Sequence, residues 1–267
     1  MTPKAIITDF DNTLVGDDLV VDEAVKTHIR RITDSGVIFA IATGRPYYGR
    51  ISEVCRELEL QNPIVVHGGA HMVNPRTGEV IWKEDIPATE VTGIIEFFQR
   101  EELFFALECA GTVYTADGSR VPFYGADIEQ KSVDQFPGED VAKVIISARR
   151  ARLNAQQADD LVKRLQDQYK DIFVIKIIKD GLYGLDITSA RASKHLAVLE
   201  WLKHTHLTEP EVLGVGDGYN DYPLLSACGV KVAMGDAPHE LKEIADYVAP
   251  AQKENGFLHV IEKYFPA

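Results

Sequence analysis

Two pairs of acidic residues lie where they could serve one ligand. Asp9 and Asp11 follow an apolar run near the N-terminus, and Asp217 and Asp221 follow another near the C-terminus. Two carboxylates on a loop that leaves a strand can approach one ligand if the backbone curls there. In open α/β sheets, ligands bind beyond the carboxyl ends of the strands. The spacing therefore indicates a carboxylate site drawn from both ends of the chain.

Two further segments carry hydrogen-bond donors at comparable positions. Thr43 and Gly44 follow the apolar run 37–42 and offer a hydroxyl and an uncovered backbone. Lys194 stands near the start of a predicted helix, whose N-terminal amides also favour anions. These donors are suited to phosphoryl oxygens, so the residue types indicate a phosphorylated ligand.

If the acidic residues converge, their shared volume requires a cation. Two unit charges about 4 Å apart repel by roughly 4 kcal/mol at an effective dielectric constant near 20. Oxygen ligands without His or Cys select a hard ion, and we expect Mg²⁺. A carboxylate nucleophile beside Mg²⁺ is the equipment for phosphoryl transfer through an aspartyl-phosphate.

Alternating strand and helix patterns at both chain ends predict the scaffold for these residues. Short apolar runs, which suit strands buried on both faces, occupy 5–7, 37–42, 64–66 and 212–215. Helical patterns follow these runs. We therefore expect an α/β domain with a doubly wound parallel sheet.

Three residues predict where helices begin. Asp22 is expected to cap a helix that ends at Gly36, and Ser193 to cap a helix that begins with Lys194. Pro46 is expected in the first turn of a further helix.

The middle of the chain has a different pattern. Between residues 83 and 186, two helical segments and several β-rich segments predict a small α+β cap domain inserted into the outer domain. The expected divisions are a first core part at 1–82, the inserted cap at 83–186, and a second core part at 187–267.

Composition narrows the class of protein and its partners. The chain has 267 residues, 45% of them apolar, and a formal net charge of −13. This excludes collagen-like, disordered and membrane-spanning classes, and an acidic surface makes nucleic acid an unsuitable partner. Three cysteines without CxxC spacing indicate reduced thiols. We expect a cytoplasmic protein that binds no membrane and is a monomer or a small homo-oligomer.

Four ordered motifs make a family resemblance recognisable. DFDNTL at 9–14, ATGR at 42–45, the lone Lys194 before an apolar helix, and GDGYND at 216–221 resemble the haloacid dehalogenase (HAD) superfamily of phosphotransferases. The insert between ATGR and Lys194 and the C-terminal segment 229–249 are similar to the Cof-type branch with a C2 (type IIB) cap. The resemblance covers nearly the whole chain.

The resemblance implies roles for individual residues. Asp9 would be the nucleophile and Asp11 the general acid/base. Thr43, Gly44, Lys194 and Asn220 would bind the substrate phosphate.

The same resemblance implies a metal site and shows two departures from the family pattern. Mg²⁺ would be held by Asp9, by Asp11 through its backbone carbonyl, and by Asp217, with Asp221 supporting it. Asn12 stands where the family usually has Gly, and His67 where it usually has Asn. Asn tolerates left-handed backbone better than most residues, so the first departure is compatible with the loop.

These observations predict Mg²⁺-dependent hydrolysis of small phosphomonoesters, such as a sugar phosphate or a similar metabolite. Two alternatives remain open on sequence. A phosphomutase uses the same aspartyl-phosphate and passes it to a second hydroxyl. A non-catalytic metabolite sensor could share the fold, although the complete set of acidic and basic residues speaks against it.

Overall fold

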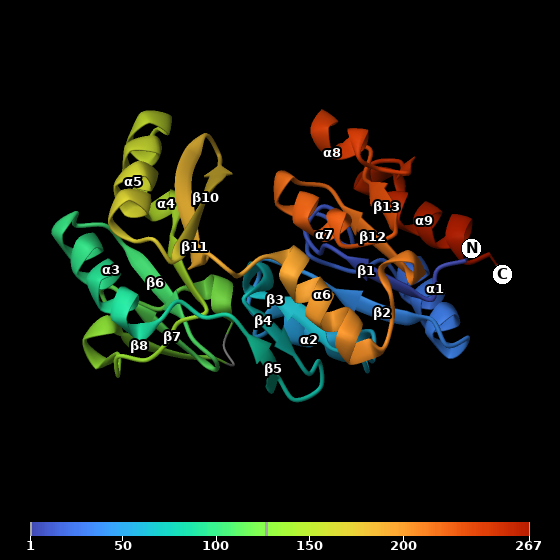
Figure 1. The fold of residues 1–267 in the computed structure, drawn as a ribbon, viewed down its shortest axis with the longest axis horizontal. Coiled ribbons are helices and arrows are strands. Elements are labelled where there is room, and N and C mark those ends of the chain that lie inside the picture. The colour runs from blue at the N-terminus through green and yellow to red at the C-terminus, as the bar shows by residue number, and fades with distance from the viewer. Residues whose placement is uncertain (1, 126–127, 267) are drawn as a thin grey trace. The chain divides into compact units, whose positions relative to one another are not determined.

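The chain divides into two compact units in a computed structural model that describes residues 2–125 and 128–266. The core unit comprises Met1–Trp82 and Ser193–Ala267, and the inserted unit comprises Lys83–Ala192. Figure 1 labels most helices and strands of both units. In the described part of the chain, no helix has the length and apolar character needed to cross a membrane.

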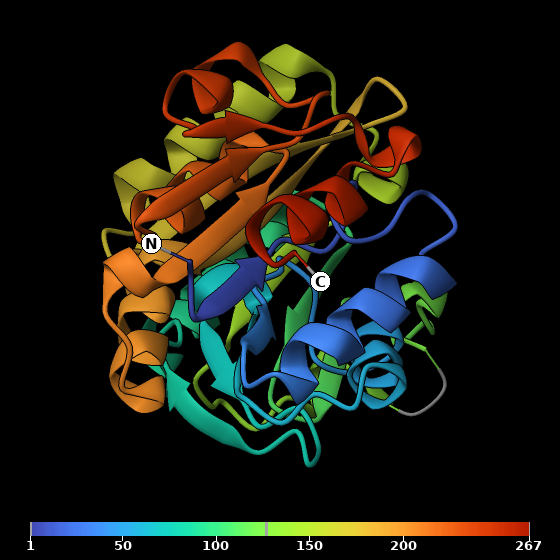
Figure 2. The same cartoon turned by 90° about the vertical axis from the view of Figure 1, so that its right-hand side faces the viewer.

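The core unit is built on a five-stranded parallel sheet with the order β14-β13-β12-β1-β2. Its strands are β1 (Ala5–Thr8), β2 (Ile38–Ile41), β12 (Val212–Gly216), β13 (Val230–Ala233) and β14 (Tyr247–Val248). Strand β1 lies between β2 and β12, which are labelled on either side of it in Figure 1, and Figure 2 shows the molecule turned by 90°. The carboxyl ends of these strands therefore meet at one edge of the sheet.

Helices cover both faces of this sheet. They are α1 (Glu23–Asp34), α2 (Arg50–Glu57), α6 (Lys194–Thr205), α7 (Tyr222–Ser226), α8 (His239–Glu243) and α9 (Gly256–Tyr264). Ile6 of β1 packs in a cluster with apolar residues of α1, α2 and α9. Its neighbours Ala5 and Ile7 pack with residues of α6 and α7. Because successive strand residues point to opposite faces, this division confirms the doubly wound arrangement.

A second, smaller sheet completes the core unit. It has the order β3-β4-β5, from β3 (Ile64–Val66), β4 (His71–Val73) and β5 (Val80–Lys83). A single parallel bridge from Ala42 to Val65 joins β3 to the segment after β2.

Two of the predicted helix starts are confirmed and one is wrong. The Asp22 side chain accepts a hydrogen bond from the Ala24 amide and caps α1, and Ser193 caps α6 in the same way. Pro46, however, lies in the irregular segment before the helix, and α2 begins only at Arg50. Gly49, with φ of 63°, separates the proline from the helix.

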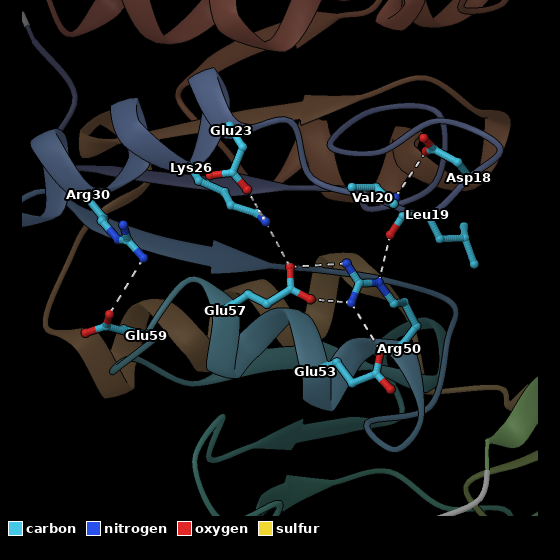
Figure 3. A network of polar contacts seen from close by, with 10 residues as sticks. All are labelled: Asp18, Leu19, Val20, Glu23, Lys26, Arg30, Arg50, Glu53, Glu57 and Glu59. Atoms are coloured by element: carbon cyan, nitrogen blue, oxygen red, sulfur yellow. Dashed lines mark hydrogen bonds and ion pairs between the residues drawn. The ribbon is translucent and has the colours of Figure 1, made fainter.

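A polar network ties the segment after the first acidic pair to helix α2 (Figure 3). Arg50 Nε donates to the Leu19 carbonyl at 2.7 Å, and its terminal nitrogen contacts Glu57 at 2.5 Å. Lys26 of α1 reaches Glu57 as well, at 3.4 Å. The network therefore links α1, α2 and the connecting segment.

The inserted unit contains a six-stranded sheet with the order β10-β11-β9-β6-β7-β8. Its strands are β6 (Phe105–Glu108), β7 (Thr112–Thr115), β8 (Glu129–Ser132), β9 (Lys143–Ile146), β10 (Ile172–Lys179) and β11 (Leu182–Ser189). All neighbouring pairs are antiparallel except β7 and β8. Its α-helices are α3 (Ala88–Arg100), α4 (Ala148–Ala151) and α5 (Ala155–Gln168).

Helices α3 and α5 pack against one face of this sheet. Leu107, Val144 and Ile187, from three adjacent strands, share a buried cluster with apolar residues of both helices. The residues next to them in sequence therefore point to the opposite face.

That opposite face carries charge at its centre. Glu108, Lys143 and Asp186 lie on adjacent strands, and we call them the mid-sheet cluster. Lys143 forms an ion pair with Asp186, and Glu108 is fully buried. Burial raises the pKa of Asp186 above its usual range, and the Lys143 ammonium only partly offsets this effect.

The chain returns to the core unit later than the sequence predicts. Strand β11 continues across the expected boundary between residues 186 and 187. It pairs along its whole length with β10, so the residues up to Ala192 belong to the inserted unit.

Candidate active site

Parallel pairing brings the segments after β1, β2 and β12 to the same edge of the core sheet. Thr8 is in register with Ile41 on one side and with Val215 on the other. The Asp9 amide then donates to the Val215 carbonyl at 2.9 Å. Asp9 is thus fixed at the strand end, where it is 4% exposed.

Lys194 contributes the central positive charge. It is the first residue of α6 and is 3% exposed. Its Nζ lies 2.5 Å from Oδ1 of Asp9 and 2.6 Å from Oδ1 of Asp221. One ammonium therefore joins an acidic residue from each end of the chain.

The loop after β12 holds its acidic residues through backbone amides. Oδ2 of Asp221 accepts hydrogen bonds from the amides of Asp217 at 3.1 Å and Gly218 at 2.9 Å. A Cβ on Gly216 would lie 2.5 Å from the Asp221 Cβ, so only glycine fits there. On the other side, the Thr13 hydroxyl donates to Oδ1 of Asp217 at 2.7 Å.

Three carboxylates come together at this point. Among the described residues, Asp9, Asp217 and Asp221 offer oxygens that all lie within 4.8 Å of one another. Together with Lys194 we call them the strand-end cluster. Its formal charge is negative, because one ammonium faces three carboxylates.

Burial and mutual repulsion perturb this cluster. Burial and the neighbouring Asp221 carboxylate raise the pKa of Asp9 well above its usual range. The same two causes raise the pKa of Asp217 to about 7. Burial acts to lower the pKa of Lys194, but the attraction of Asp221 and Asp9 outweighs it and raises the pKa.

The donor set of the strand-end cluster fits a hard divalent cation. Its metal-ligating atoms are carboxylate oxygens only, which are the ligands that Mg²⁺ prefers. Three carboxylates face one ammonium, so Lys194 alone does not balance their charge. A cation would relieve this repulsion.

Asp11 lies on the same loop as Asp9 but outside the group of three converging carboxylates. Arg45 holds it. Arg45 Nε donates to Oδ2 at 2.8 Å, and a terminal nitrogen donates to Oδ1 at 2.6 Å. The side chain of Asp11 is 40% exposed, so it remains accessible to a ligand.

Thr43 is buried in the loop after β2. Its Oγ1 accepts from the Arg45 amide at 3.1 Å, and its carbonyl accepts from the Gly68 amide at 3.0 Å. Gly44, which precedes Arg45, is partly buried. The structure thus places both residues at the same sheet edge as Asp9.

The loop after β3 lies against the backbone at the start of α6, next to Lys194. A Cβ on Gly69, which has φ of 105°, would lie 2.5 Å from the Lys194 backbone nitrogen. The same loop contains His67, which is 2% exposed and has φ of 53°. The His67 ring centroid lies 5.0 Å from that of His71.

The last residue that was expected to bind the substrate phosphate is exposed. Asn220, in the 3-10 turn Tyr219–Asp221, is exposed, and its Oδ1 lies 2.4 Å from where a Gly218 Cβ would stand. Asn12 has φ of 54°, which is the left-handed conformation expected where the family usually has glycine.

Two residues of this site received no individual role from the sequence. Thr13 binds Asp217 across 204 positions, and Arg45 binds Asp11 across 34 positions. Both residues belong to recognisable motifs, DFDNTL and ATGR, but neither motif tells which distant side chain the residue contacts.

The fold and the site together define the class of protein. The core is a doubly wound sheet with acidic residues and a lysine at its carboxyl edge, and an α+β unit is inserted into it. This arrangement is typical of α/β enzymes that transfer phosphoryl groups. The family model for haloacid dehalogenase-like hydrolases matches residues 6–261, and the chain belongs to this family.

Individual relatives agree over nearly full length. The chain is 25% identical to the 5-amino-6-(5-phospho-D-ribitylamino)uracil phosphatase YitU of Bacillus subtilis, over 98% of each chain. It is 23% identical to the phosphatase YwpJ of the same organism, over 97% of this chain and 99% of the other.

Solved structures give the same fold. The subclass IIB sugar phosphatase BT4131 of this superfamily superimposes with a TM-score of 0.78 at 20% identity, covering 98% of this chain and 99% of the other. Family membership and these relatives of nearly equal length identify the chain as an HAD-type phosphatase.

Proposed function

We propose that the protein hydrolyses small phosphomonoesters in a Mg²⁺-dependent reaction through an aspartyl-phosphate on Asp9. The observation that carries this proposal is the strand-end cluster. A buried carboxylate, Asp9, is held by Lys194 next to two further carboxylates that suit a cation. Such a carboxylate is a nucleophile for phosphoryl transfer.

In the first step, an oxygen of Asp9 attacks phosphorus and the ester bond to the leaving oxygen breaks. Asp11 donates a proton to that oxygen, so the alcohol leaves neutral. In the second step, Asp11 takes a proton from water, and the water oxygen attacks phosphorus. The bond from phosphorus to Asp9 breaks, which releases inorganic phosphate and restores the carboxylate.

Four residues are proposed to hold the transferring phosphoryl group. Thr43 supplies a hydroxyl, Gly44 an uncovered backbone amide, Lys194 an ammonium, and Asn220 a side-chain amide. Donors placed where charge develops stabilise the transition state more than the ground state. Asn220 is exposed, so its contribution requires a ligand that reaches the loop after β12.

Mg²⁺ is proposed to be held by Asp9, Asp217 and the backbone carbonyl of Asp11. When bound, it supplies a positive charge that stabilises the phosphoryl oxygens. Asp221 holds the other groups of the site in place, since one of its oxygens accepts from Lys194 and the other accepts from two backbone amides. The residues proposed to bind or support the metal are thus Asp9, Asp11, Asp217 and Asp221, as the sequence predicts.

The substrate is proposed to be a sugar phosphate or a similar phosphorylated metabolite. YitU, a phosphatase of a phosphoribitylamino compound, and BT4131, a sugar phosphatase, support this class. The three cysteines are free and buried, which fits a reducing compartment, and we place the protein in the cytoplasm.

A phosphate-release screen tests the proposal. The protein is incubated with a panel of phosphorylated metabolites, with excess Mg²⁺ or with EDTA, and inorganic phosphate is measured. We expect release only with Mg²⁺ and a loss of about 10⁴-fold or more in Asp9→Asn, because the nucleophile is removed. Asp85→Asn in the inserted unit is the matched control.

Two results would contradict the proposal. The first is full activity in Asp9→Asn, and the second is unchanged activity in EDTA. Phosphorus-labelled substrate provides a separate check, since acid quenching should trap label on the wild-type chain and leave none on Asp9→Asn.

A further inference from the structure

Arg45 and Asp11 form an ion pair with two-point contact at the sheet edge. Arg45 Nε lies 3.0 Å from Oδ1 and 2.8 Å from Oδ2, while a terminal nitrogen lies 2.6 Å from Oδ1. Both carboxylate oxygens are therefore engaged by one planar guanidinium. Such two-point contacts fix orientation as well as distance.

The backbone of Arg45 is anchored on two sides. Its amide donates to Oγ1 of Thr43 at 3.1 Å, and its carbonyl accepts from the His67 amide at 2.9 Å. The guanidinium carbon also lies 5.7 Å from the centre of the Phe10 ring. These contacts restrict the arginine, so it can serve as a fixed point for a neighbouring side chain.

Asp11 needs such a fixed point more than Asp9 does. Asp9 is buried and held by Lys194, whereas the Asp11 side chain is 40% exposed and stands on a loop. A general acid/base must lie within hydrogen-bond reach of the proton that it transfers. An error of about 1 Å in the placement of a reacting group costs about 100-fold in rate.

We propose that Arg45 is a positioning residue, which orients the Asp11 carboxylate for proton transfer and ties it to the loop that carries Thr43. This inference rests on the proposed function, in which Asp11 is the acid/base. Arg45 acts through Asp11 and makes its contribution in the proton-transfer step. Loss of the guanidinium should therefore affect turnover in proportion to how much the leaving group needs a proton.

Two matched esters separate this role from direct substrate binding. Phenyl phosphate has a leaving group that benefits from protonation, whereas p-nitrophenyl phosphate has one that departs readily without it. We expect Arg45→Ala to lower kcat/KM, which reports the ester-cleavage step, on phenyl phosphate by about 10- to 100-fold, with a clearly smaller loss on p-nitrophenyl phosphate and no rise in KM.

A double-mutant cycle isolates the dependence on Asp11. In an Asp11→Asn background, adding Arg45→Ala should change kcat on p-nitrophenyl phosphate by less than about twofold, because the group that Arg45 orients is already absent. Arg45→Lys should restore part of the loss, since lysine offers a charge without the two-point geometry.

Controls keep the outcomes distinct. Arg164→Ala removes a guanidinium–carboxylate pair of the inserted unit, with Glu101, and should leave kcat unchanged. Thermal unfolding checks that each variant is folded, and the cycle is run with Arg45→Lys if Arg45→Ala is not.

Three results would overturn the inference. These are equal losses of kcat/KM on both esters, a rise in KM without a fall in kcat, and additive losses in the cycle. If Asp9→Asn is inactive while Arg45→Ala keeps full kcat on both esters, the proposed function stands and this inference alone is wrong. If Asp9→Asn is active, the proposed function is wrong as well.

Discussion

The two units bury charged side chains in different structural settings. The strand-end cluster of the core unit lies on loops beyond the strands, and two backbone amides donate to Asp221 there. The mid-sheet cluster of the inserted unit lies within paired strands, whose backbone amides bond to neighbouring strands. Among the described residues, Oδ1 of Asp186 has no hydrogen-bond partner.

This difference explains where a protein can concentrate acidic residues. Beyond a strand end, amides are available to carboxylates and space remains for a cation. Within a sheet, a buried carboxylate depends on neighbouring side chains, such as Lys143 for Asp186. The strand-end cluster should therefore respond to added cations, and the mid-sheet cluster should not.

The largest expected effect comes from removing each cluster's lysine. Lys194→Met should destabilise the metal-free protein by about 3 to 5 kcal/mol near pH 8, because it leaves buried carboxylates uncompensated. Lys143→Met should have a similar effect for the same reason. Urea unfolding with EDTA or with excess Mg²⁺ distinguishes them, since Mg²⁺ should recover stability in Lys194→Met only.

Mg²⁺ should also stabilise the unaltered protein. At a concentration about 100 times its dissociation constant, a ligand that binds only the folded state adds about 2.7 kcal/mol. Asp217→Asn should lose most of this shift in thermal unfolding, while Asp186→Asn should keep it. Equal shifts in both variants would mean that the ion does not bind the strand-end cluster.

The pH dependence of stability provides a further test. A carboxyl whose pKa is raised on folding binds protons in the folded state that the unfolded state has released, so stability falls as pH rises. Asp217 has a pKa of about 7 in the folded chain against 3.8 as the reference. Metal-free protein should therefore gain stability as pH falls from about 8 to about 5, by roughly 2 kcal/mol.

The size and slope of this effect should depend on Asp217. In Asp217→Asn the gain on acidification should shrink, and excess Mg²⁺ should suppress it in the wild type by favouring the ionised form. Urea unfolding across this pH range measures both. If the stability of the metal-free wild type instead rose from pH 5 to pH 8, the predicted direction of the pH dependence would be wrong.

The smallest expected effect concerns the hydroxyl that binds Asp217. Thr13→Val keeps the side-chain shape and removes the bond to Oδ1, and it should cost about 1 to 2 kcal/mol in the metal-free protein. Thr92→Val on helix α3 removes an exposed bond to the Ala88 carbonyl and should change stability by less than about 0.5 kcal/mol. Chemical unfolding of both variants compares them.

Sequence patterns predict the core sheet well because its strands are continuous apolar runs. The runs that contain Ile6 and Leu213 become β1 and β12, which pair directly. The same patterns fail at Pro46, where proline at a helix start looks the same as proline in a turn. They also end the insert at residue 186, inside β11, although Asp180 and Gly181, both with positive φ, form the tight turn from β10 into that strand.

The candidate site is predicted only as far as position along strands determines it. Placement at strand ends brings Asp9 and Asp217 together, as the sequence indicates. The contacts of Thr13 and Arg45 depend on side-chain directions across distant loops, which no local pattern encodes. The catalytic and ligand-binding roles of these residues stay predictions.

The position of β1 in the core sheet has a consequence for the order of folding during synthesis. Strand β1 lies between β2 and β12, so one of its edges is completed by residues made about 200 positions later. The whole inserted unit is translated in that interval. Until Val212–Gly216 emerges, the apolar β1 keeps an open edge that could pair wrongly with other strands. The ribosome-bound chain therefore passes through a stage in which the insert is fully translated while the core sheet still lacks β12.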